Sequence, residues 1–117
     1  MRNFRKYEVW KRAIELSKDI YSLTESFPDK EKFALSNQIQ RAAVSVASNI
    51  AEGSSRNSEI EFVRYLEIAL GSAFEVETQL IIAHEIGYIS KEILDQEVEK
   101  LHTLQKQLNQ FITTIKS

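Results

Sequence analysis

The few residues that interrupt a helix are what most limit the folds open to this chain. It has three glycines and one proline, and Pro28, Gly53 and Gly87 divide it into four segments. A sandwich of short strands needs many more turns, so these breaks favour long, uninterrupted helices. Apolar residues make up 43% of the 117 positions, enough for one hydrophobic core. We therefore expect a single all-α domain over residues 1–117.

The breaks carry signals for the ends of helices. Pro28 disfavours a helical Phe27, so a first helix is expected from about Tyr7 to about Ser26. Gly53 is expected to close the second helix as a left-handed residue. Gly87 is expected to end the third helix in the same way.

The starts of the last two helices are also marked. Ser58 and Glu61 have the spacing of a capping box, in which each side chain bonds a free backbone amide of the other residue. Ser90 is expected to cap the fourth helix, with Glu92 complementing the helix dipole. The third helix should therefore run from about Ser58 to Ile86.

Each segment has apolar residues at helical spacing. The last is the clearest, because Leu94, Leu101, Leu108 and Ile115 recur every seven residues. Four such helices joined by short turns predict an antiparallel, up-down-up-down four-helix bundle.

Composition narrows the functional classes. The absence of cysteine excludes a disulfide framework and a thiolate metal site, and it suits a reducing compartment. The longest apolar run, Leu80 to Ala83, is far shorter than a membrane span. The basic start has no apolar signal stretch, so we expect a cytoplasmic protein that does not enter a membrane.

Charge is unevenly distributed along the chain. Residues 1–18 carry six cations against two acids, a balance of +4, whereas residues 59–99 carry ten acids against two cations, a balance of −8. Solvated helix faces explain such a pattern most simply, but opposite charges could also orient contacts between copies of the chain.

The second helix carries a polar stripe that a plain bundle does not need. Gln38, Arg41, Ser45, Ser48, Asn49 and Glu52 advance in steps of three and four, with small residues beside them. On the third helix Gly71, Ser72, Glu75 and Gln79 form a similar track. Glycine is costly in mid-helix, so Gly71 is expected where another backbone comes close. We favour a semi-buried polar network at a subunit interface over an exposed face or a ligand or nucleic-acid surface.

Arg41 is the most informative residue of the stripe. A guanidinium among small residues is either paired with a carboxylate or presented to a phosphate. Glu52 is too far along the same helix, so the expected partners are Glu75 or an acid of a neighbouring copy.

The sequence resembles a bacterial family named for intervening sequences in 23S ribosomal RNA genes. The resemblance lies in residues 4–13, in the block 38–53 that reads QIQRAAVSVASNIAEG, and in Gly71, Glu75 and residues 87–89. It implies a cytoplasmic four-helix bundle that assembles as a homopentamer. It also implies similarity to accessory proteins of diversity-generating retroelements, whose basic pentamers bind nucleic acid and a reverse transcriptase.

Two departures weaken the nucleic-acid inference. The family commonly has two arginines where this chain has Gln40 and Arg41, and proline where it has Ala47. The pI of about 5.7 also differs from the strongly basic relatives. The cations that could contact RNA or DNA are Arg5, Lys11, Arg12, Arg41 and Arg56.

Catalytic chemistry has little support. Glu99 and His102 form one Glu-x-x-His, but a di-iron site needs a second copy and His84 does not supply it. We expect no catalytic residues, metal, cofactor or small-molecule substrate. The sequence predicts a non-enzymatic, homo-oligomeric assembly or accessory module, with nucleic-acid binding as the alternative.

Overall fold

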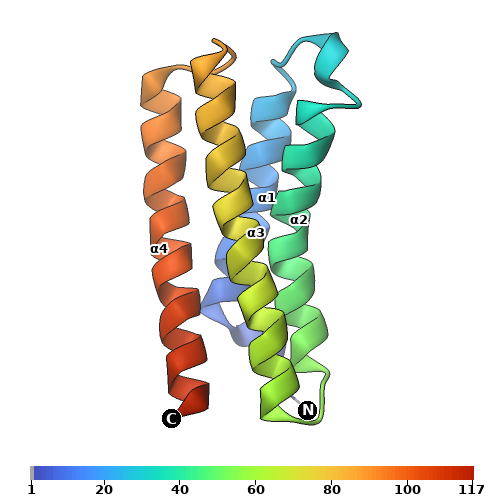
Figure 1. The fold of residues 1–117 in the computed structure, drawn as a ribbon, viewed down its shortest axis with the longest axis vertical. Coiled ribbons are helices and arrows are strands. Elements are labelled where there is room, and N and C mark those ends of the chain that lie inside the picture. The colour runs from blue at the N-terminus through green and yellow to red at the C-terminus, as the bar shows by residue number, and fades with distance from the viewer. Residues whose placement is uncertain (1) are drawn as a thin grey trace.

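The computed structural model describes residues 2–117, and this part of the chain contains helices and no strands. The predicted all-α fold is confirmed (Figure 1). Two short 3-10 helices, η1 and η2, precede α1 and α2. The elements are η1 (Phe4–Lys6), α1 (Glu8–Thr24), η2 (Asp29–Glu31), α2 (Leu35–Ser54), α3 (Glu59–Glu85) and α4 (Lys91–Lys116).

The four long helices form an up-down-up-down bundle 43 Å long. The described part of the chain begins and ends at the same end of the bundle as the α2–α3 turn, and the other two connections lie at the opposite end (Figure 1). Neighbours in sequence pack side by side, and α1 and α4 complete the ring with the least extensive packing. The α2–α3 and α1–α4 edges therefore lie on opposite sides of the bundle.

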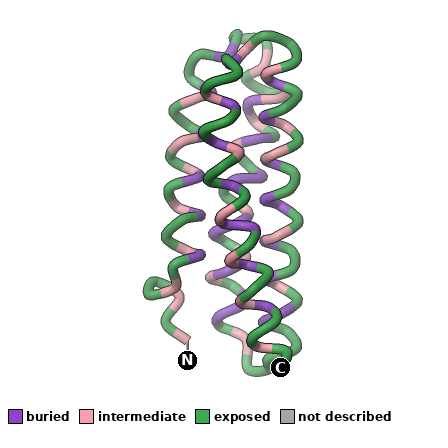
Figure 2. Tube along the Cα trace, turned by 90° about the vertical axis from the view of Figure 1, so that its left-hand side faces the viewer, coloured by how far each residue is buried: buried purple, intermediate pink, exposed green. Residues whose placement is uncertain are grey.

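The core follows the axis of the bundle, where buried positions from all four helices face inward (Figure 2). Ile20, Ile50, Leu66 and Leu101, one from each helix, are completely buried. At this burial each side chain contributes about 1.5–3 kcal/mol to stability. No helix within residues 2–117 has the length and apolar character needed to cross a membrane.

Local signals set the starts of α3 and α4 as expected. The Ser58 hydroxyl accepts a 3.1 Å hydrogen bond from the amide of Glu61, and Ser90 accepts one of 3.1 Å from the amide of Ile93. The second half of the predicted capping box is absent. The carboxylate of Glu61 instead accepts from the Ser58 hydroxyl at 3.3 Å.

The glycines act differently from the prediction at two of three positions. Gly87 has φ +91° and follows the end of α3, as expected. Gly53 has no positive φ and lies inside α2, so its prediction as a left-handed cap is wrong. A Cβ on Gly53 would lie 2.6 Å from the Cβ of Tyr65, so this glycine is needed where α2 and α3 approach each other.

The prediction for Gly71 is also not met within the subunit, because no close neighbour requires a glycine there. A Cβ built on Gly71 meets nothing within 4 Å, and the residue is exposed. The subunit's own fold therefore brings no backbone close to Gly71. The close approach that was expected there occurs at Gly53 instead.

Candidate assembly surface

The predicted polar residues of α2 and α3 meet in a groove between the two helices. Six of them line it together with Ala42, around a volume of about 360 Å³. They are Gln38, Arg41 and Ser45 from α2, and Ser72, Glu75 and Gln79 from α3. Helical periodicity on both helices brings these residues to one edge of the bundle, which we call the α2–α3 groove.

Hydrogen bonds join the two helices at the floor of the groove. Ser72 donates to the Ser45 hydroxyl at 3.0 Å, and the Asn49 amide donates to the same hydroxyl at 2.9 Å and to the Ser45 carbonyl at 2.8 Å. Ser72 is buried, while Ser45 and Asn49 are half-buried. Because these hydroxyls and the amide satisfy one another, they form the semi-buried polar part of the predicted network.

The rest of the predicted stripe is more open. Ser48 and Glu52 are exposed on α2 and do not line the groove, and Gly71 is exposed on α3. The predicted network at these positions is therefore not formed within one subunit. Gln79 lines the groove, but its Oε1 atom is buried without a hydrogen-bond partner among the described residues.

Arg41 and Glu75 face the same groove without forming an ion pair. Arg41 is in no salt bridge within residues 2–117, although both side chains are exposed and line the same depression. The expected Arg41–Glu75 pairing is therefore not formed in the isolated subunit. The other partner predicted for Arg41 is an acid of a neighbouring copy, and this pairing stays a prediction.

The outer face of α3 carries exposed apolar side chains that the sequence pattern did not predict. Five large apolar side chains on it are exposed, including Ile60 at 84% and Phe74 at 53%. They are Ile60, Ile68, Phe74, Ile81 and Ile82, which we call the α3 outer face. The available signal was that α3 has isoleucines and a phenylalanine outside the stripe of residues that faces the core.

Small residues lie along the middle of the α3 outer face. At about 100° per residue, Gly71 and Thr78 fall between Ile68 and Ile82 on the side of α2 and Phe74 and Ile81 on the side of α4. The rows on either side of this midline are apolar except at the exposed Glu67 and Glu75. A low midline between such ridges can accept the ridge of another helix at close distance. Gly71, which the fold of the subunit does not require, lies on this midline.

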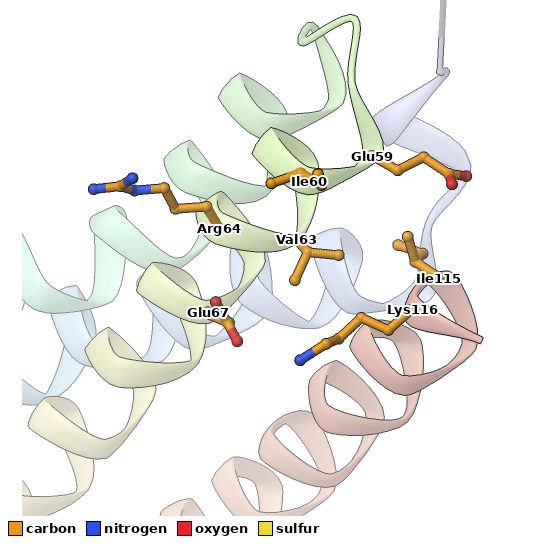
Figure 3. Close-up of a pocket in the computed structure, with 7 residues that line it drawn as sticks. All are labelled: Glu59, Ile60, Val63, Arg64, Glu67, Ile115 and Lys116. Carbon is orange, nitrogen blue, oxygen red and sulfur yellow. The ribbon is translucent and has the colours of Figure 1, made fainter.

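A wider depression lies at one end of the α3 outer face, between α3 and the end of α4 (Figure 3). Its volume is about 640 Å³. Ile60, Val63 and Ile115 form its apolar part, and charged side chains surround them. The charged residues are Glu59, Arg64, Glu67 and Lys116.

The cations considered for nucleic-acid contact are not gathered in one patch. Arg5 is exposed on η1, and Lys11 and Arg12 are exposed on α1. Arg12 lines depressions between α1 and α4, whereas Arg41 lies in the α2–α3 groove on the opposite edge. These residues therefore cannot all contact one short stretch of phosphates on a single subunit.

Arg56 is largely engaged within the fold. It donates a 2.7 Å hydrogen bond to the Tyr65 hydroxyl, and its guanidinium lies 4.9 Å from the centre of the Tyr65 ring. Its carbonyl accepts from Arg2 at 2.7 Å. Arg56 therefore fixes the α2–α3 turn, and its availability to a phosphate is limited.

Each histidine contacts one protein group: His102 a carboxylate and His84 a backbone carbonyl. The Nε2 atom of His102 lies 3.2 Å from a carboxylate oxygen of Glu77, and Nδ1 of His84 lies 3.0 Å from the Ile89 carbonyl. Within residues 2–117, no three His, Cys, Asp or Glu residues are grouped to hold a metal ion. In the same part of the chain, no further pair of metal-ligating side chains is therefore grouped with Glu99 and His102.

The whole fold and most of the sequence have known relatives. The family model for the 23S rRNA-intervening sequence protein matches residues 5–110. A crystal structure from Bacteroides thetaiotaomicron, described as a protein with unknown function from the S23 ribosomal protein family, is similar with a TM-score of 0.83 and 28% identity. The similarity covers 90% of this chain and 95% of the other. No curated protein matches the sequence.

Proposed function

Because the chain belongs to the 23S rRNA-intervening sequence protein family, we propose that it is a non-enzymatic module that assembles with copies of itself. The subunits meet through the α3 outer face and the adjoining α2–α3 groove. Five copies is the number that the family resemblance implies. The exposed apolar side chains of α3 are the observation that carries this proposal.

The energetic argument rests on how much apolar surface α3 leaves in water. Single subunits that act alone rarely expose large contiguous apolar patches, and Phe74, Ile81 and Ile82 are exposed within about two turns of α3. Covering the exposed half of an Ile or Phe side chain returns about 1 kcal/mol. Five such side chains on one helix, with Gly71 and Thr78 between them, therefore favour close packing against another helix.

The α2–α3 groove adds polar groups that a second copy could satisfy. Arg41 has no ion-pair partner within residues 2–117, and Oε1 of Gln79 is buried without a donor. The negative balance of residues 59–99 supplies carboxylates on every copy. A neighbouring acid paired with Arg41 would fix the register of the contact, since charge-assisted bonds are directional.

A second candidate function is nucleic-acid binding through the basic start of the chain. The +4 balance of residues 1–18 and the exposure of Arg5, Lys11 and Arg12 favour it. Glu15 lies among these cations and pairs with Lys18 at 3.5 Å, which lowers the local positive potential. Retention on RNA or DNA that falls steeply with added salt would support this function.

The assembly proposal is tested with a matched pair of variants. Phe74→Glu places a charge on the α3 outer face, and Tyr21→Glu places the same charge on α1 at a side chain of similar exposure, 51% against 53%. We expect Phe74→Glu to lower the mass measured by light scattering, because a carboxylate is costly to bury at an interface. Tyr21→Glu should leave the mass unchanged.

The proposal fails if the two variants behave alike. An unchanged mass in Phe74→Glu would show that α3 is not the contact surface. Circular dichroism of both variants separates lost assembly from lost folding, since the bundle should keep its helical content in each.

A further inference from the structure

A buried carboxyl group lies on the α1–α4 edge, away from the assembly surface. Glu97 on α4 is 7% exposed, and its Oε1 atom has no hydrogen-bond partner among residues 2–117. The nearest cation is Lys100, whose Nζ is 3.9 Å from Oε2 of Glu97 but 2.9 Å from Oδ2 of Asp19 on α1. Lys100 therefore pairs mainly with Asp19, and a negative charge on Glu97 would be only weakly compensated.

Asp19 and Glu97 converge on the same cation across the boundary of α1 and α4, because Nζ of Lys100 lies within 4 Å of an oxygen of each carboxyl group. Two carboxylates can only accept hydrogen bonds, so a bond between them forms only when one is protonated. The side chain of Glu97 is the more buried of the two. Burial and then the charge and hydrogen bond of Asp19 raise the pKa of Glu97 to about 7, and Lys100 opposes this rise.

The charged groups around the pair come from both helices of this edge. On α1, Glu15 adds negative charge near Lys100, and Arg12 lines the same depression as Glu15 and Lys100. From α3, no hydrogen bond or ion pair reaches Glu97 within residues 2–117. The α3 carboxylate that faces α4, Glu77, bonds to His102 and Gln105 instead.

We propose that Asp19 and Glu97 form a proton-operated clasp that holds α1 against α4 when they share a proton and loosens when the proton is lost. This edge is the least extensively packed of the bundle. Apart from the proposed bond between Asp19 and Glu97, the Lys100–Asp19 bond is the single side-chain hydrogen bond between α1 and α4 in the described part of the chain. A change at the clasp therefore acts on the edge with the fewest other restraints.

The direction of the pH effect follows from the protonation of the two states. The folded chain keeps a proton on Glu97 at pH values where the unfolded chain, with an ordinary pKa of 4.5, has lost it. The contribution of the clasp to the free energy of unfolding is complete below the pKa of Glu97 in the unfolded chain, and it is lost as pH rises through about 7. This is opposite to the usual behaviour of a paired carboxylate.

Thermal unfolding of Glu97→Gln tests the clasp, because glutamine imitates the protonated acid at every pH. Between about pH 5 and about pH 8, the melting midpoint of the unaltered protein should fall by several degrees more than that of Glu97→Gln. The two histidines are present in both proteins, so their contribution cancels. Glu99→Gln, at an exposed position two residues away, should follow the unaltered protein.

A carboxyl carbon titration by NMR keeps the test independent of how the variant folds. In the unaltered protein the Glu97 side-chain carbon should titrate near pH 7, and in Asp19→Asn it should titrate at lower pH. Parallel melting profiles of the unaltered protein and Glu97→Gln would overturn the proposal. A Glu97 carbon that titrates at the ordinary glutamate value would overturn it as well.

Discussion

Gly53 on α2 lies so close to Tyr65 on α3 that a Cβ atom on Gly53 would be 2.6 Å from the Cβ of Tyr65. The ring of Phe62 would be 3.2 Å away, so neither neighbour leaves room. The relationship fixes how near the two helices run at the end of the bundle that holds their turn. It also distinguishes Gly53, which packing within the subunit requires, from Gly71, which that packing does not require.

Gly53→Ala should therefore destabilise the protein. The added methyl group gains helix propensity of about 1 kcal/mol, but overpacking against Tyr65 costs about 1–3 kcal/mol and requires α2 and α3 to move apart. Urea unfolding followed by circular dichroism measures the net loss. Stability equal to that of the unaltered protein would contradict the close contact.

Gly71 provides the opposite case on α3. Within a subunit its Cβ position is open, so Gly71→Ala should add about 1 kcal/mol of helix stability. Gly71→Leu is expected to keep the helical content but to lower the mass in solution, because its side chain fills the midline of the α3 outer face. A Gly71→Leu protein of unchanged mass would place the midline outside the interface.

The Arg41→Ala variant distinguishes self-assembly from nucleic-acid binding. If Arg41 pairs with an acid of a neighbouring copy, Arg41→Ala should weaken assembly by about 1–3 kcal/mol, since that carboxylate loses its partner. If Arg41 contacts phosphate, the mass should stay constant and the salt slope of nucleic-acid binding should fall by about one. A variant that changes neither mass nor retention would make Arg41 an ordinary surface residue.

Tyr88 and Glu31 connect the two loops at the far end of the bundle. The Tyr88 hydroxyl donates to Oε2 of Glu31 at 2.7 Å, and the amide of Leu35 donates to Oε1 at 3.2 Å. The Tyr88 bond first, and the Leu35 bond second, lower the pKa of Glu31 below its ordinary value of 4.5. This stabilisation is present above the ordinary pKa and is lost as pH falls through the lowered one.

Tyr88→Phe should remove most of this effect. The variant is expected to melt at a lower temperature near neutral pH and to lose less stability than the unaltered protein on acidification below the ordinary glutamate pKa of 4.5. Melting midpoints across this range provide the measurement. Identical acid profiles for the two proteins would show that the Tyr88–Glu31 bond does not form in solution.

The fold was predictable because its signals are local. Ser58, Gly87 and Ser90 act on the backbone within one turn of themselves, so sequence alone indicates where α3 begins and ends and where α4 begins. Pro28 predicted the end of α1 less closely, because this helix ends at Thr24 rather than near Ser26. The groove was predictable in part, because helical periodicity brings Arg41, Ser45 and Ser72 to one edge.

The errors concern packing between segments that are distant in sequence. Gly53 is required because Tyr65 lies against it, and Gly71 is not required within the subunit because a Cβ there would meet nothing within 4 Å. Local helix propensity reports neither of these contacts. The α3 outer face escaped notice because helical spacing cannot tell a buried Leu66 from an exposed Phe74 until neighbouring helices are placed.

The mass of the unaltered protein in solution shows whether its subunits assemble. Light scattering over a concentration series should give a constant mass several times the 13.5 kDa of one chain, with five copies favoured. A protein that stays at 13.5 kDa at micromolar concentration would contradict the assembly of subunits through the α3 outer face.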